Sequence, residues 1–286
     1  MRKVTIFGFF VLLAASALAQ TTPAPATPAL TPTTPPAWPT AHFASTKDPS
    51  VQKAFQVLND MIKALGGDTY LNVRDMKSEG RSYTFYHGQP NGQGLEFWRF
   101  WEWPDKERVE LTKQRDVIEL FVGDKGYEIT YKGTATQDPK EMQDYLRRRD
   151  HSLEWMVRKW LAASDTMILY DGTAMVEQKL TDQVTILNST NDSVTLSVDP
   201  RSHLPVRKTY SYRDPLDRQL DDEAEVFSNY RLVQGIQTPM SLVRHRNGEM
   251  TSQRFITSVT YNNGFPSTMF ETKGLTYNQP KSGERK

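Results

Sequence analysis

The chain of 286 residues contains no cysteine. Disulfide bonds, thiolate metal sites and cysteine nucleophiles are therefore excluded. Bacterial lipoproteins are anchored through an acylated cysteine, so we also expect no anchor of that kind. The domain must be stabilised by its hydrophobic core alone, and residues 41–286 are enough chain to bury one.

Neither sign of charge is in excess, because Lys and Arg total 35 whereas Asp and Glu total 34. Proteins that bind nucleic acid carry a basic patch or a strong excess of positive charge. The near-neutral composition does not supply one. We therefore expect no nucleic-acid partner.

Recognisable catalytic motifs are also lacking. The five histidines show no H-E-x-x-H spacing, and the chain has neither a G-x-S-x-G nucleophile elbow nor a phosphate-binding glycine loop. His151 and Glu154 lie three residues apart, but two ligands without others do not make a metal site. We therefore predict a non-enzymatic protein without catalytic residues, metal or cofactor. A hydrolase whose distant residues converge on a polar cleft stays open as an alternative.

The first residues have the order typical of a secretory signal peptide. Arg2 and Lys3 precede an apolar run, residues 4–18, and a small-x-small cleavage site ends at Ala19. The run is shorter than the roughly 20 residues that a membrane span needs. We predict a signal peptide at 1–19, cleavage near Ala19 and a periplasmic or secreted mature protein. An uncleaved N-terminal anchor is the alternative.

Composition divides the rest of the chain. Residues 20–47 contain a Pro/Thr/Ala-rich tract, which is typical of an extended linker. Residues 48–272 alternate between periodic segments and turns and form the predicted folded domain. Residues 273–286 form a polar tail.

Two segments have helical periodicity. The first follows an Asp-Pro pair at 48–49, has apolar residues at spacings of three and four, and stops at the Gly-Gly pair 66–67. The second begins with a capping-box arrangement at 138–141, and its apolar stripe runs over residues 142–161. It predicts one amphipathic helix of about six turns.

The other segments have the period of two that is typical of strands. Turns rich in Gly, Asn or Asp separate them, and no helix lies between most of them, so antiparallel pairing is expected. The ten predicted strands lie near 73–86, 95–103, 106–113, 116–122, 125–132, 194–198, 205–213, 222–233, 238–246 and 250–262. Because such a sheet twists and curls, we predict an α+β fold, mainly β: a half-open antiparallel β-barrel of about ten strands covered by two amphipathic helices.

Four stretches resemble segments of a known family. They are residues 64–80 (ALGG, then VRDMKSEG), 199–206 (DPRSHLPV), 227–239 (FSNYRLVQGIQTP) and 259–270 (VTYNNGFPSTMF). In order and spacing they resemble the outer-membrane lipoprotein carriers and lipoprotein-sorting proteins of the LolA/LolB-like fold. The resemblance implies a lidded, incomplete β-barrel that binds acyl chains or other hydrophobic ligands and has no catalytic residues. The acylated cysteine of the anchored members is absent, and the Pro/Thr-rich tract is not part of the carrier pattern.

Residues 95–103 (LEFWRFWEW) form the most aromatic predicted strand. Because side chains alternate between the two faces of a strand, Phe97, Arg99, Trp101 and Trp103 share one face. Two interpretations stay open: the rings line a concave apolar pocket, or they only fill the core. A buried Arg99 needs a carboxylate or a free helix carbonyl, which makes it a candidate latch to the lid. The alternative is a position at the rim with its guanidinium in water.

The second predicted helix offers apolar side chains that would face those rings. Methionine adapts to varied apolar shapes, so this stripe is either an adaptable surface under the lid or ordinary core. The candidate ligand-binding residues are Phe97, Trp101, Trp103, Leu153, Met156 and Trp160.

Together these features predict an exported periplasmic protein that sequesters a lipid or lipoprotein acyl chain in a lidded apolar cavity, as in lipoprotein transport and sorting. Envelope proteins and the membrane surface are further candidate partners. The alternative function is an envelope sensor or interaction module of the same fold that binds a polypeptide through a sheet edge or the lid. A dry, fully packed interior would favour that alternative.

Overall fold

The computed structural model describes residues 43, 45–215 and 217–272. They lie in the second of the two units into which the chain divides, Pro35–Lys286. The predicted signal peptide at 1–19, most of the predicted linker at 20–47 and the predicted tail at 273–286 lie outside the described residues. In the part that is described, no helix is long and apolar enough to cross a membrane.

Helix α2 (Pro49–Leu65) begins and ends where the sequence predicts. The Asp48 side chain accepts a hydrogen bond from the Ser50 amide at 2.8 Å, which satisfies one of the free amide groups at the helix start. The helix stops at Gly66, which has a φ of 135°. Residues that carry a side chain rarely adopt this angle. A Cβ atom there would also lie 2.7 Å from the Gly235 carbonyl oxygen, so the helix end packs directly against a turn of the sheet. The short helix α3 (Asp68–Leu71) follows.

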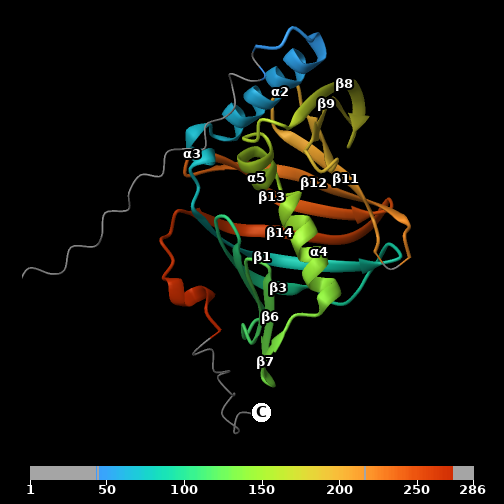
Figure 1. Ribbon diagram of the computed structural model, residues 1–286. Coiled ribbons are helices and arrows are strands. Elements are labelled where there is room, and N and C mark those ends of the chain that lie inside the picture. Colours follow the sequence, from blue (N-terminus) through green and yellow to red (C-terminus); the bar gives the residue numbers. More distant parts are fainter. Residues whose placement is uncertain (1–42, 44, 216, 273–286) are drawn as a thin grey trace, which may run out of the picture. The chain divides into compact units, whose positions relative to one another are not determined.

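Fourteen strands form one antiparallel sheet (Figure 1). Its order is β7 (Gly133–Thr136), β6 (Lys125–Thr130), β5 (Val117–Val122), β4 (Lys106–Leu111), β3 (Leu95–Glu102), β1 (Asp75–Tyr86), β14 (Glu249–Tyr261), β13 (Ile236–Arg246), β12 (Leu220–Val233), β11 (Pro205–Arg213), β10 (Ser193–Val198), β9 (Lys179–Leu187) and β8 (Met167–Val176). Strand β2 (Gln89–Pro90) pairs only with β1. The sheet thus grows outward in both directions from a central pair made by β1 and β14.

The sequence predicted about ten strands, and β2, β7, β8 and β9 are the four that it did not predict. The β8–β9 hairpin turns at Glu177 and Gln178, which hold positive φ angles of 47° and 61° without the Gly or Asn that normally signals such a turn. Exposed apolar residues such as Met167 and Met175 also hide the alternating pattern of β8. The end strands β7 and β8 do not pair with each other. The α+β class fits, whereas the predicted ten-stranded barrel is not confirmed.

Helix α4 (Pro139–Asp150) is shorter than predicted. Asp138 caps it by accepting hydrogen bonds from two amide groups of its first turn, as the sequence indicates. The helix stops at His151, because Ser152 is extended and caps a new helix by accepting a bond from the Trp155 amide. That helix is α5 (Leu153–Trp155), and the π-helix η1 (Met156–Trp160) continues it. The predicted single helix of six turns is therefore wrong beyond Asp150.

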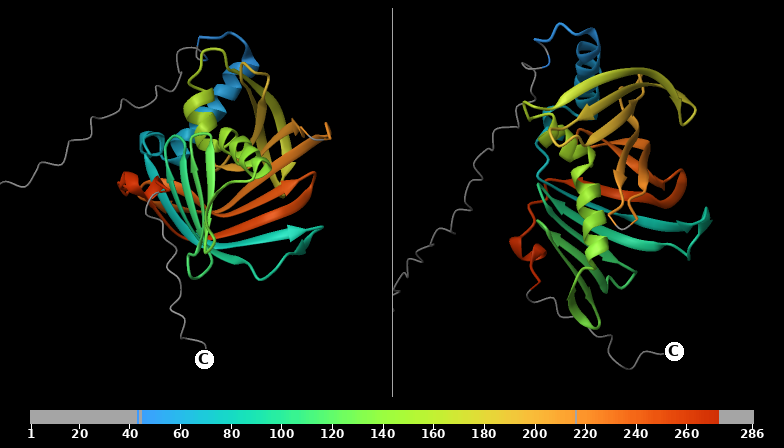
Figure 2. Two further views of the ribbon diagram at one scale, coloured as in Figure 1. Left: turned by 60° about the horizontal axis from the view of Figure 1, so that its bottom comes forward. Right: turned by 45° about the vertical axis from the view of Figure 1, so that its right-hand side comes forward.

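The main hydrophobic core lies between the helices and one face of the sheet. Its members include Leu58 and Met61 of α2, Met156 of η1 and Leu196 of β10. A second, smaller cluster surrounds Phe100 on the opposite face, where the 3₁₀-helix η2 (Ser267–Phe270) covers it. Figure 2 shows α2 and α4 on the same side of the sheet.

Helix α4 bridges two distant parts of the sheet. Its Tyr145 ring stacks on Phe121 of β5 with 3.7 Å between ring centroids, and its Arg147 guanidinium lies 3.5 Å from the ring centroid of Tyr212 on β11. Six strands separate β5 from β11, which would place them roughly 33 Å apart in a flat sheet. A helix of this length spans only about 18 Å. The sheet must therefore curve strongly beneath α4.

Candidate functional site

A cavity of about 230 Å³ lies between the curved sheet and helix α4. Strands β1, β3–β5 and β11–β14 form its floor, and residues of α4 and α5 cover it. Pockets that hold drug-sized ligands measure roughly 300–1,000 Å³. The cavity is therefore smaller than such pockets, and an outward shift of α4 would enlarge it.

One end of the cavity is apolar and lies beside α2 and α3. Three of its residues lie side by side on adjacent strands, because Met76 of β1 pairs with both Trp101 of β3 and Tyr261 of β14. Its lining residues include Leu65, Tyr70, Met76, Trp101, Tyr230, Ile236, Val259 and Tyr261. The Tyr70 hydroxyl is buried and has no hydrogen-bond partner within the described residues, whereas the Tyr261 hydroxyl bonds to Thr238 at 2.8 Å.

Farther along the same strands the wall becomes charged. The cationic lining residues are Arg99, Arg148, Arg149, Lys208, Arg244 and Arg254, and the anionic ones are Glu107, Glu119, Glu154 and Glu225. Five of these side chains form two groups of ion pairs. Arg99 bonds to both carboxylate oxygens of Glu107 at 2.6 and 3.0 Å, and Glu225 pairs with Lys208 at 3.0 Å and with Arg244 at 3.1 Å.

These pairs overcome the penalty of burial. Burial alone would raise the pKa of Glu107 and of Glu225, because it disfavours the charged carboxylate. The neighbouring cations outweigh burial and lower the pKa of both groups below the usual value. Both carboxylates therefore stay ionised near neutral pH.

Arg254 is different, because it makes no ion pair with any residue that the structure describes. Burial lowers its pKa to about 10, and repulsion from Arg244 and Arg99 adds to the effect, whereas attraction to Glu107 and Glu225 opposes it. Three other charged lining residues, Arg148, Glu119 and Glu154, also lack an ion pair among the described residues. Burial raises the pKa of Glu119.

A β-bulge turns Arg254 toward the cavity. Glu79 of β1 pairs with Ser258, but the next residue, Gly80, pairs with Ile256, so Thr257 is an extra residue in β14. The bulge reverses the alternation of faces along the strand. Without it, the inward position of Val259 would place Phe255 inside and Arg254 outside. Instead Arg254 lines the cavity, and Phe255 is 44% exposed.

The sequence-predicted site residues divide into two groups. Phe97, Trp101 and Leu153 line the cavity. Met156 and Trp160 are buried members of the main core, and Trp103 packs against that core with the Arg158 guanidinium 3.8 Å from its ring centroid. These three are not among the lining residues.

Arg99 lines the cavity as well, but its contacts differ from those of the predicted latch. Both of its hydrogen bonds go to Glu107 on the neighbouring strand β4. No residue of α4 or α5, both fully described, accepts a bond from it. Arg99 thus reaches a carboxylate, as burial demands, within the sheet.

Apart from Arg99, the sequence did not predict the charged residues of the cavity wall. Alternation assigns charged residues to the solvent face of a strand, and no local signal marks a bulge that brings Arg254 inside. One signal was present on β13. Arg244 lies two residues after the apolar Leu242, so alternation places both side chains on the same face of the strand.

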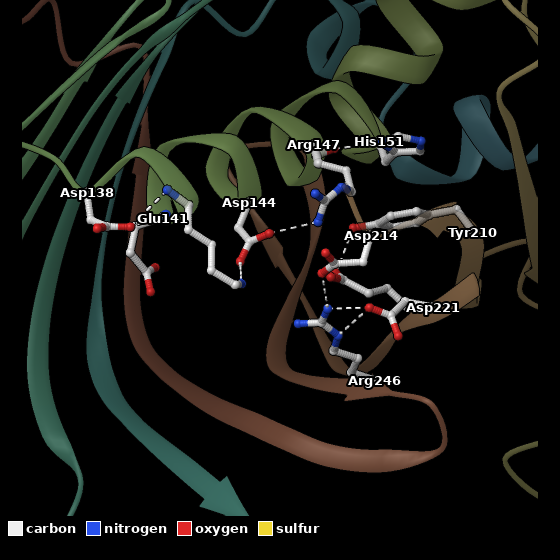
Figure 3. Close-up of polar contacts among 11 residues, drawn as sticks. Asp138, Glu141, Asp144, Arg147, His151, Tyr210, Asp214, Asp221 and Arg246 are labelled. Carbon is white, nitrogen blue, oxygen red and sulfur yellow. Dashed lines mark hydrogen bonds and ion pairs between the residues drawn. The ribbon is translucent and has the colours of Figure 1, made fainter. Parts of the chain in front are cut away.

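Polar and aromatic contacts anchor α4 on the side of β11 (Figure 3). Arg147 donates a hydrogen bond to Asp144 at 2.8 Å. Its guanidinium also lies on the Tyr212 ring. His151 is buried at the end of α4, where its ring stacks on Tyr210 with 4.0 Å between centroids. In the described parts of the chain, no group of three or more His, Asp or Glu side chains is arranged to hold a metal ion.

No family model and no curated protein matches this sequence. Among solved structures, a DUF1329 family protein from Desulfovibrio piger matches with a TM-score of 0.55 and 14% identity, over 78% of this chain and 99% of that one. This similarity shows a shared fold. At the level of the fold alone, the resemblance predicted from the sequence motifs is confirmed.

Two further structures match with a TM-score of 0.49. One is a putative outer membrane lipoprotein-sorting protein domain from Vibrio parahaemolyticus, at 7% identity over 77% of this chain and 96% of that one. The other is a LolA superfamily protein from Nitrosomonas europaea, at 10% identity over 76% of this chain and 97% of that one.

Proposed function

We propose that this protein is an exported, non-enzymatic binding protein that sequesters a lipid or lipoprotein acyl chain under α4. The observation that carries the proposal is the cavity, whose apolar end is lined by aliphatic and aromatic side chains such as Met76, Trp101 and Val259. Burial of hydrocarbon contributes roughly 0.8 kcal/mol per CH₂ group, so a chain of about ten carbons gains roughly 8 kcal/mol before the cost of moving α4.

The two groups of predicted site residues then have different roles. Phe97, Trp101 and Leu153 contact the chain, because they line the cavity. Trp103, Met156 and Trp160 support them from the core. The location that fits this role is the periplasm or the cell exterior, after cleavage near Ala19.

Entry of the chain requires α4 to move. The helix is held to β5 by the Tyr145–Phe121 stack, and on the side of β11 by the Arg147–Tyr212 contact and the His151–Tyr210 stack. Each contact of this kind is worth roughly 0.5–1.5 kcal/mol. The burial of an acyl chain is large enough to offset the loss of all three.

Native mass spectrometry of the mature protein, purified from a cell envelope without detergent, tests the proposal. A discrete added mass that solvent extraction removes and identifies as lipid would support it. A clean unliganded mass, together with no uptake of a fluorescent fatty acid, would rule it out.

A matched pair of variants locates the site. Val259→Phe fills the apolar end, and Ser258→Phe adds the same ring at an exposed position of the same strand. We expect V259F to weaken probe uptake at least tenfold and S258F to leave it within twofold. Equal effects of the two variants would place the chain elsewhere.

The alternative function, binding of a polypeptide, has one observation in its favour. Edge strand β8 pairs with a strand on one side only, although the Tyr170 amide donates to the Ser50 hydroxyl of α2 at 3.0 Å. Its Met167 and Met175 side chains are 55% and 68% exposed. An extended segment of a partner can add to such an edge. A protein that takes up no acyl probe but gains a strand-like peptide would favour this function.

A further inference from the structure

The cavity holds an arginine, Arg254, that forms no ion pair with a described residue, although Glu107 and Glu225 attract it from a greater distance. Of the carboxylates that line it, Glu107 is bonded to Arg99, and Glu225 is shared by Lys208 and Arg244. Arg254 has no carboxylate within ion-pair distance among the described residues; its guanidinium lies 5.6 Å from the centroid of the Phe97 ring. Arg254 is half-buried, and a guanidinium partly removed from water without an ion-pair partner is destabilising, which makes it a candidate to bind an anionic ligand.

The position of Arg254 relative to the apolar end indicates which chemical groups the ligand carries. On β14, Tyr261 and Val259 line the apolar end, Ile256 follows, and Arg254 comes after it on the same face. A hydrocarbon chain at Tyr261 and Val259 therefore has its other end close to Arg254. Because guanidinium groups bind carboxylate and phosphate oxygens by paired hydrogen bonds, the matching ligand has an acidic group at that end.

The cover supplies a second cation. Arg148 of α4 lines the cavity and has no ion pair with a described residue. Against the larger effect of burial, Arg254 and, to a smaller extent, Arg148 both lower the pKa of Glu119 on β5, so the two guanidinium groups act on the same part of the cavity. The lining includes six cationic and four anionic side chains, so cations outnumber anions by two. An oxyanion bound at Arg254 would also attract Arg148 and so favour a closed α4.

We propose that the cavity binds an acidic amphiphile, with the hydrocarbon chain at the apolar end and the carboxylate or phosphate oxyanion on Arg254. The inference rests on the proposed function and names its ligand class. Glu119 opposes the oxyanion when it is ionised. The raised pKa that burial gives Glu119 weakens this opposition.

Four probes test the inference on the mature protein by isothermal titration calorimetry: decanoate, decyl phosphate, decanol and acetate. We expect decanoate or decyl phosphate to bind at least tenfold more tightly than decanol, and the tighter of the two identifies the head group. Acetate should bind at least a hundredfold more weakly, since it lacks the chain. Equal affinity for decanol and both acidic probes would overturn the inference and leave the proposed function intact. If none of the three ten-carbon probes (decanoate, decyl phosphate and decanol) binds, both the inference and the proposed function are overturned.

Variants assign the oxyanion to Arg254. Arg254→Gln should lose at least tenfold in affinity for the acidic probe and change by less than twofold for decanol, and R254K should restore part of the loss. Arg231→Gln is the matched control, because Arg231 is exposed on β12 outside the cavity. R254Q should also raise the melting temperature of the unliganded protein by a few degrees, since it removes a half-buried charge that has no ion pair and is repelled by Arg244 and Arg99. An equal loss for decanol, or a lower melting temperature, would overturn the assignment.

Discussion

Gly80 of β1 faces the backbone of Phe255 on β14 so closely that a Cβ atom at Gly80 would lie 2.0 Å from the Phe255 carbonyl oxygen. The contact occurs beside the bulge at Thr257, whose hydroxyl donates to the Glu79 carbonyl oxygen at 3.1 Å. A glycine is thus required where the two central strands come together. The same junction turns Arg254 into the cavity.

Replacement of Gly80 tests this junction. We expect Gly80→Ala to lower the free energy of unfolding by at least about 2 kcal/mol, because the backbone atoms it meets cannot move away as a side chain would. Gly264→Ala is the control, since Gly264 has a positive φ of 70° but open space around its Cβ position, and should cost about 1 kcal/mol. Urea denaturation measures both. A loss in G80A no greater than in G264A would contradict the steric argument.

The anchoring of α4 can be weakened from one side. Arg147→Gln removes the contact with Tyr212 and should destabilise the closed helix by about 1 kcal/mol, which raises hydrogen exchange in residues 139–150 about fivefold. Lys140→Gln is the control, because Lys140 bonds to the same Asp144 at 2.9 Å but is exposed. Unchanged exchange in R147Q would show that other contacts hold the helix.

Glu225 should make the fold sensitive to acid. Its pKa in the folded state lies below the 4.5 of the free group, so its stabilising effect is complete above about pH 4.5 and is lost as the pH falls through the folded-state pKa. Glu225→Gln should therefore show a shallower loss of stability in acid. At pH 7 it should be less stable by about 3 kcal/mol, because it leaves Lys208 and Arg244 unpaired.

Glu119 should behave in the opposite way. Its pKa is raised in the folded state by burial, so its contribution to stability is present below about pH 4.5 and is lost as the pH rises through the raised value. Glu119→Gln should therefore equal the wild type in acid and exceed it at pH 7. Urea denaturation from pH 4 to pH 8 compares the E119Q and E225Q variants, and an E119Q variant less stable than wild type at pH 7 would disprove the expectation.

Two tyrosines at the apolar end offer a matched comparison. Tyr70→Phe removes a buried hydroxyl that has no partner within the described residues, and it should raise the free energy of unfolding by up to about 1 kcal/mol. Tyr261→Phe breaks the bond to Thr238 and should lower the free energy of unfolding by about 1 kcal/mol. Thermal unfolding of both variants measures the difference, and a Y70F variant as unstable as Y261F would show that the Tyr70 hydroxyl is satisfied.

Both ends of α2 and most strands could be predicted from the sequence, because residues close together in the sequence determine them. The limits of α2 follow from the Asp48 cap and from Gly66, and both are readable because cap and stop act on residues within one turn. Most strands follow from alternation, which needs no knowledge of the partner strand. Prediction failed at Glu177 and Gln178, whose turn conformation is unusual for their residue types, and at Ser152, whose capping role competes with an unbroken apolar stripe.

The sequence by itself determined that this chain forms a mainly antiparallel sheet with amphipathic helices and that one strand is unusually aromatic. Only the tertiary structure decided that β1 pairs with β14, about 180 residues away, because register between distant strands depends on contacts that no local period records. That pairing places a bulge at Thr257, and the bulge determines that an arginine, rather than a phenylalanine, faces the cavity. The apolar lining is therefore partly readable from alternation, whereas the charge beside it arises from the way in which the two central strands meet.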